Sequence, residues 1–147
     1  MEELLSKAIT IALRAHEGQV DKAGRPYASH IMRVTEMCNT LDEKITGALH
    51  DIVEDTQWTF EMLYDEGFPK HIVDAVECLT RREGEDYFDY ISRVKENELA
   101  SRVKINDLND NMDPRRCEEL SDLNIERLSR YQKAKQELVD ALSKRKF

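Results

Sequence analysis

The chain has 147 residues, of which 40% are apolar and 35% charged, and its formal net charge is −8. This apolar fraction excludes a disordered chain, and no apolar run reaches the roughly 18 residues that a membrane-spanning helix needs. The acidic charge argues against nucleic acid or an anionic membrane as a partner, and three scattered cysteines without a signal peptide predict a cytoplasmic protein.

Apolar residues recur at helical spacing along the chain, and no segment alternates with the two-residue period of a strand. Residues 2–17 predict a first helix, and a loop containing Gly and Pro follows it. Pro26 is typical of the first turn of a second helix, and Asp42 can cap a third. Further helices are expected at residues 59–67, 69–84, 88–94, 100–108 and 121–143. We therefore expect one all-α domain over residues 1–147, a bundle of about seven or eight helices.

The segment from His50 to Thr56 carries the clearest chemical pattern. His50 and Asp51 place an imidazole beside a carboxylate, and both groups bind divalent metals well. Glu54 and Asp55 follow one helical turn later, where two carboxylates could orient a water molecule. A His followed by an acid is also common on a solvated helix flank, and the similar pair at His16 is assigned no metal role.

Two more polar residues fall on otherwise apolar helix faces. His30 lies four residues before Val34, and Asp107 lies four residues after Val103. A buried carboxylate must be paired or bound to a metal, whereas a buried histidine alone is commonly a core residue. Together with His50 and Asp51, these residues would supply two imidazoles and two carboxylates. That set is better suited to Mn, Fe, Zn or Co than to Ca or Mg.

Several stretches of the chain resemble HD-domain phosphohydrolases, and among them the hydrolase half of RelA/SpoT-type alarmone enzymes. The matching segments are AHEGQ at 15–19, KAGRPYASH at 22–30, ALHDIVEDT at 48–56, LTRREGE at 79–85 and VKIND at 103–107. The resemblance extends over nearly the whole chain. It implies an all-α HD fold and, since no length remains for a synthetase domain, a stand-alone small hydrolase.

The same resemblance implies the site and its reaction. It implies one Mn(II) held by the residues His30, His50, Asp51 and Asp107. The reaction would remove the 3′-pyrophosphate from ppGpp or pppGpp, giving GDP or GTP. Glu54 and Asp55 would position and deprotonate the attacking water. The candidate substrate-binding residues are Lys22, Tyr27, Lys104 and Asn111.

The residue types at these four positions agree with such roles. Lys22 and Lys104 could form charge-assisted bonds with phosphate, and Tyr27 could stack on a base or simply pack in the core. Asn111 matches a polar position near the nucleotide.

Two departures from the larger family members keep other functions open. Asp21 precedes Lys22 where those members often carry two basic residues, and the segment after Asp107 also differs. An HD phosphohydrolase of another phosphorylated nucleotide, such as NADPH or a 5′-nucleotide, is therefore a second hypothesis. A nucleotide sensor without catalysis is a third, and the paired amphipathic helices allow a homodimer.

Overall fold

The computed structural model describes residues 2–21, 23–116 and 125–145. Within these ranges the chain is helical and contains no strand, which confirms the all-α prediction. The elements are α1 (Glu2–Ala15), α2 (Tyr27–Met37), α3 (Leu41–Leu49), α4 (Ile52–Asp55), α5 (Phe60–Asp65), α6 (Lys70–Leu79), α7 (Tyr87–Lys95), α8 (Glu98–Asn111), η1 (Pro114–Arg116) and α9 (Ile125–Arg145). No helix in the described part of the chain is both long and apolar enough to cross a bilayer.

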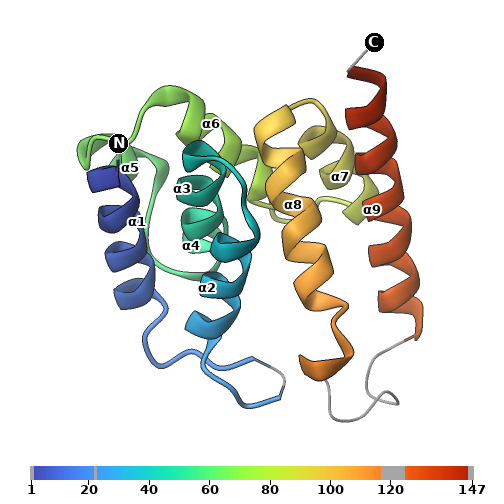
Figure 1. The fold of residues 1–147 in the computed structure, drawn as a ribbon, viewed down its shortest axis with the longest axis horizontal. Coiled ribbons are helices and arrows are strands. Elements are labelled where there is room, and N and C mark those ends of the chain that lie inside the picture. The colour runs from blue at the N-terminus through green and yellow to red at the C-terminus, as the bar shows by residue number, and fades with distance from the viewer. Residues whose placement is uncertain (1, 22, 117–124, 146–147) are drawn as a thin grey trace.

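Helix α3 lies near the middle of the molecule and packs against α1, α2, α6 and α8 (Figure 1). One buried apolar cluster joins α1 with α3, α4, α5 and α6. A second cluster joins α2 and α6 with α7, α8 and α9, so that α6 contributes to both. Because α2, α3 and α8 also contact one another pairwise, residues distant in sequence meet where these three helices come together.

The helix ends follow the local sequence, with one correction. Thr59 caps α5 by accepting a hydrogen bond of 3.2 Å from the Met62 amide, as expected. The cap of α3 is Thr40 and not Asp42. Thr40 Oγ1 accepts from the amide of Glu43 and donates to its carboxylate, and this leaves Asp42 inside the first turn.

The third predicted helix is divided in two at His50 and Asp51. Asp51 has φ −107° and ψ 2°, outside the helical region, and separates α3 from the single turn α4. The Asp55 amide still donates to the Asp51 carbonyl, at 3.0 Å. The break leaves Glu54 and Asp55 on a turn of their own beside the Asp51 carboxylate.

Candidate metal centre and its surroundings

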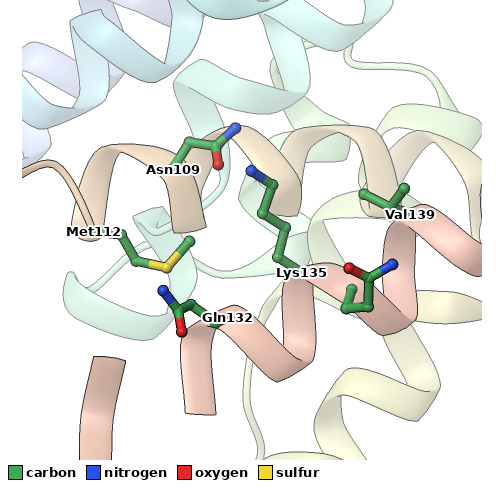
Figure 2. A pocket seen from close by; sticks show the side chains of 6 residues that line it. Asn109, Met112, Gln132, Lys135 and Val139 are labelled. Carbon is green, nitrogen blue, oxygen red and sulfur yellow. The ribbon is translucent and has the colours of Figure 1, made fainter. Parts of the chain in front are cut away.

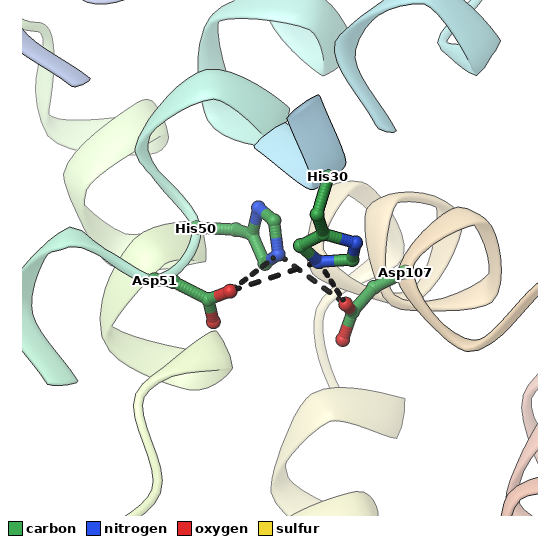
Figure 3. A group of neighbouring side chains, drawn as sticks. All are labelled: His30, His50, Asp51 and Asp107. Carbon is green, nitrogen blue, oxygen red and sulfur yellow. Dashed lines mark ion pairs between the residues drawn. The ribbon is translucent and has the colours of Figure 1, made fainter. Parts of the chain in front are cut away.

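The four predicted metal ligands come together where α2, α3 and α8 meet. His30 comes from α2 and Asp107 from α8, whereas His50 and Asp51 are the two residues between α3 and α4 (Figure 3). One potential ligand atom of each residue lies within 4.8 Å of the corresponding atoms of the other three. The sequence predicted these residue types, and the packing of three helices supplies their proximity.

In this cluster, the Nε2 atoms of both histidines face both aspartates. His30 Nε2 lies 3.0 Å from Asp107 Oδ1, and His50 Nε2 lies 3.0 Å from Asp51 Oδ2. The cross distances are 3.8 Å from His30 to Asp51 and 3.4 Å from His50 to Asp107. Each histidine is only 1% exposed and Asp107 4%, whereas the Asp51 side chain is 14% exposed, so the cluster opens to solvent at Asp51.

The electrostatics of the cluster keep its carboxylates ionised. Burial alone would raise the pKa of Asp51, but the charge and the hydrogen bond of His50, together with the charge of His30, outweigh burial and hold the pKa at about 2. Burial opposes ionisation of Asp107 too, and Lys104 with the two histidines nevertheless lowers its pKa well below the usual value. Two imidazoles and two ionised carboxylates fit a divalent transition metal.

Two predicted substrate contacts, Lys104 and Asn111, lie against Asp107. Lys104 Nζ donates to Asp107 Oδ2 at 2.7 Å and lies 5.2 Å from the centre of the Tyr90 ring. Asn111 Nδ2 donates to Asp107 Oδ1 at 3.2 Å. Since Lys104 engages Oδ2, the other oxygen of Asp107 is the one that faces the histidines.

Tyr27 likewise contacts the cluster directly, because its hydroxyl donates a hydrogen bond to Asp51 Oδ2. Its ring lies between two imidazoles, with ring-centre distances of 5.3 Å to His16 and 5.2 Å to His30. Burial, together with the Asp51 charge, raises the Tyr27 pKa, so the phenol stays protonated as a donor. Lys22, the remaining predicted substrate contact, lies outside the described residues.

The two predicted catalytic carboxylates lie at the exposed side of the cluster. Carboxylate oxygens of Asp51, Glu54 and Asp55 lie within 4.8 Å of one another. Glu54 Oε1 accepts from the Arg81 amide at 2.7 Å, which orients this side chain. Burial raises the pKa of both groups, and the neighbouring Asp51 charge helps to bring that of Asp55 to about 6. A carboxylate with a raised pKa is a better proton acceptor near neutral pH.

Two residues that the sequence analysis did not assign to the site belong to this region. His16 is 1% exposed, and its Nδ1 lies 2.8 Å from Gln19 Oε1, while Gln19 Nε2 donates to the Asp55 carbonyl. Asp110 is 3% exposed and lies 2.6 Å from His30 Nδ1. The sequence could have indicated this placement, because Asp110 lies seven residues after Val103 and therefore on the same face of the helix as Asp107.

A pocket of about 510 Å³ between α8 and α9 is a separate feature (Figure 2). Its lining consists of Asn109, Met112, Gln132, Lys135, Gln136 and Val139. None of these is a predicted site residue, and the set offers no carboxylate or imidazole as a metal ligand. This pocket is therefore not part of the candidate metal centre.

Comparison with known proteins finds sequence relatives that are named as (p)ppGpp hydrolases or GTP pyrophosphokinases. No model of a protein family matches the chain. The bifunctional (p)ppGpp synthase/hydrolase SpoT of Escherichia coli is 32% identical over 81 residues, which are 52% of this chain. The guanosine-3′,5′-bis(diphosphate) 3′-pyrophosphohydrolase of Haemophilus influenzae is 36% identical over 77 residues, or 48% of the chain. A GTP pyrophosphokinase of Myxococcus xanthus is 35% identical over 85 residues, or 54% of the chain. The chain spans 11% of the length of each of these relatives.

A solved structure extends the likeness to almost all of the fold. It is described as a metazoan orthologue of SpoT that hydrolyses ppGpp, and it superposes with a TM-score of 0.73 at 22% identity. The match covers 95% of this chain and 85% of the other. At this identity the likeness shows a shared helical fold. Sequence relatives and fold together identify the chain as a RelA/SpoT-type HD domain.

Proposed function

We propose that this protein is a metal-dependent (p)ppGpp 3′-pyrophosphohydrolase, which converts ppGpp or pppGpp to GDP or GTP and pyrophosphate. The observation that carries the proposal is the meeting of His30, His50, Asp51 and Asp107 in a buried cluster beside two further carboxylates. Relatives named as enzymes of this substrate support the choice of reaction.

The four clustered residues are the proposed ligands of one divalent metal, for which we favour Mn(II). Such an ion, when bound, acts as a Lewis acid that lowers the pKa of water and offsets phosphate charge. Tyr27, Lys104 and Asn111 hold the two ligand carboxylates through the contacts described above. We therefore propose that these three residues act on the substrate mainly through the ligands, whereas Lys22 contacts phosphate directly.

Glu54 and Asp55 are the proposed catalytic carboxylates. Both lie next to Asp51, on the exposed side of the cluster from which a nucleotide and water would approach. Their role is to orient the attacking water and to accept its proton, and their raised pKa values favour this role near neutral pH. The hydrogen bond from the Arg81 amide holds Glu54 in place for it.

The test is product analysis of the purified protein with ppGpp, with and without Mn²⁺, beside a panel of NADPH and 5′-nucleotides. We expect GDP and pyrophosphate in equal amounts, only with the metal, and no product from Asp51→Ala. Phosphate release from the panel, with ppGpp left intact, would show that the substrate is another phosphorylated nucleotide. Binding of ppGpp without any turnover over hours would identify a sensor.

We also propose that the protein acts in the cytoplasm, in the alarmone signalling of the stringent response. Cys38 and Cys78 are free thiols in the structure, as is common in a reducing compartment.

A further inference from the structure

The buried carboxylate of Asp110 contacts the predicted metal ligand His30 on the side of the ring that faces away from the cluster. Asp110 Oδ2 lies 2.6 Å from His30 Nδ1, while His30 Nε2 lies 3.0 Å from Asp107 Oδ1. Asp110 therefore lies at the ring edge opposite the other ligands and cannot join them on the same ion. Because Asp110 is only 3% exposed, its charge must be compensated by a group other than the proposed metal.

Arg33 supplies the counter-charge for this carboxylate. Its Nε lies 2.8 Å from Asp110 Oδ1, and its Nη2 lies 3.3 Å from Oδ2. Arg33 and His30 are both on α2, three residues apart, so that Asp110 of α8 accepts hydrogen bonds from two side chains of one helix face. The three residues form a charged connection between α2 and α8 directly behind the cluster.

This contact places a proton on Nδ1 of His30. A carboxylate can only accept at this position, so Nδ1 must donate, and Nε2, which faces Asp51 and Asp107, is the nitrogen that would bind a metal in place of a proton. His50 also carries a proton on Nδ1, but its partner differs, because this nitrogen donates to the Gly47 carbonyl at 2.6 Å. Side-chain replacement can remove the Asp110 contact but not the carbonyl contact, so the two histidines can be distinguished experimentally.

We propose that Asp110, held by Arg33, is a positioning residue that sets the tautomer and orientation of His30 and thereby the metal affinity of the site. The proposal rests on the metal site proposed above and adds a residue outside its ligand set. Hydrogen-bond partners of this kind, placed behind a metal-ligating histidine, generally change metal affinity 10- to 100-fold when they are removed.

The first experiment measures Mn²⁺ affinity by calorimetry on the metal-free protein, without any nucleotide. We expect Asp110→Ala to weaken binding about 10- to 100-fold, and Asp110→Asn to weaken it less, because an amide oxygen can still accept from Nδ1. Asp113→Asn is the matched control, since Asp113 follows on the same segment and pairs with the exposed Arg115. Unchanged affinity in Asp110→Ala would overturn the proposal.

The second experiment needs no metal and no activity. Long-range ¹H–¹⁵N spectra of the histidine rings in the metal-free wild-type protein should show a proton on Nδ1 of His30. Asp110→Ala should move His30 toward the Nε2–H form and leave His50 unchanged. An Nδ1 of His30 without a proton in the wild type would overturn the proposal, even where Asp110→Ala does not fold. If these spectra behave as expected but the wild type binds no Mn²⁺, the proposed metal site fails and the positioning of His30 stands.

Discussion

Asp107 in the cluster and Asp110 behind it each use both carboxylate oxygens. Asp107 accepts from Lys104 through Oδ2 and faces His30 through Oδ1. Asp110 contacts Arg33 through both oxygens and His30 through Oδ2. In a buried site such division gives both oxygens of a carboxylate a partner, which offsets the cost of burying the charge. Orientation at this scale depends on contacts that no residue pattern specifies.

At the residue scale, Glu54→Gln should separate metal binding from turnover. The amide keeps the size of Glu54 and its acceptor for the Arg81 amide, but it cannot take a proton from water. We expect Mn²⁺ affinity within about threefold of the wild type, and kcat for ppGpp lower by about 10²- to 10⁴-fold. Glu61→Gln, an exposed acid on α5, is the control. Wild-type turnover in Glu54→Gln would show that the base lies elsewhere.

At the scale of elements, Arg93 binds the segment between α6 and α7 at several points. Arg93 of α7 donates to both carboxylate oxygens of Glu85, at 2.7 Å each, and to the Thr80 carbonyl. Glu85 also accepts from the Arg82 amide. This segment includes Arg81, whose amide binds Glu54, and so the ion pair supports the position of a proposed catalytic residue.

Glu85→Gln should therefore lower the free energy of unfolding by about 2 kcal/mol at pH 7, the usual cost of losing a hydrogen-bonded charge. The hydrogen bonds from Arg93 lower the pKa of Glu85 from 4.5 to about 2. The stabilisation is complete above pH 4.5 and is lost as the pH falls toward 2. Urea unfolding should thus show a smaller difference between wild type and variant at pH 3 than at pH 7.

Asp74→Asn is the control for this comparison, because Asp74 pairs with the exposed Lys70 on the surface of α6. Exposed pairs of this kind contribute little to stability, because water and salt screen the two charges. A Glu85→Gln variant that is as stable as Asp74→Asn at pH 7 would contradict the structural role of the ion pair.

At the scale of the whole molecule, the proposed ligands belong to three helices and exist as a set only in the folded chain. A metal that binds the folded state alone stabilises it by about 2.7 kcal/mol at a concentration of 100 Kd. Mn²⁺ should raise the Tm, and a chelator should reverse the rise. Asp51→Ala should show neither effect, and an equal shift in that variant would place the metal at another site.

Helix α9 contributes to stability without carrying any proposed ligand. Leu138 is fully buried in the cluster that joins α7, α8 and α9. Leu138→Ala should cost about 2–5 kcal/mol in urea unfolding, as expected for a large buried side chain. Val139→Ala, at a 37% exposed position on the same helix, should cost much less. Equal effects would show that α9 is not packed as described.

The sequence by itself determined the helical class and the residue types of the site, because helical periodicity and ligand chemistry are properties of short segments. The tertiary structure decided what depends on distant contacts. It showed that Lys104 engages Asp107 and that the chain breaks at Asp51. It also brought Asp110 to His30, 80 residues away in sequence. Such pairings arise from the packing of α2, α3 and α8, which buries apolar faces and thereby determines which polar atoms meet.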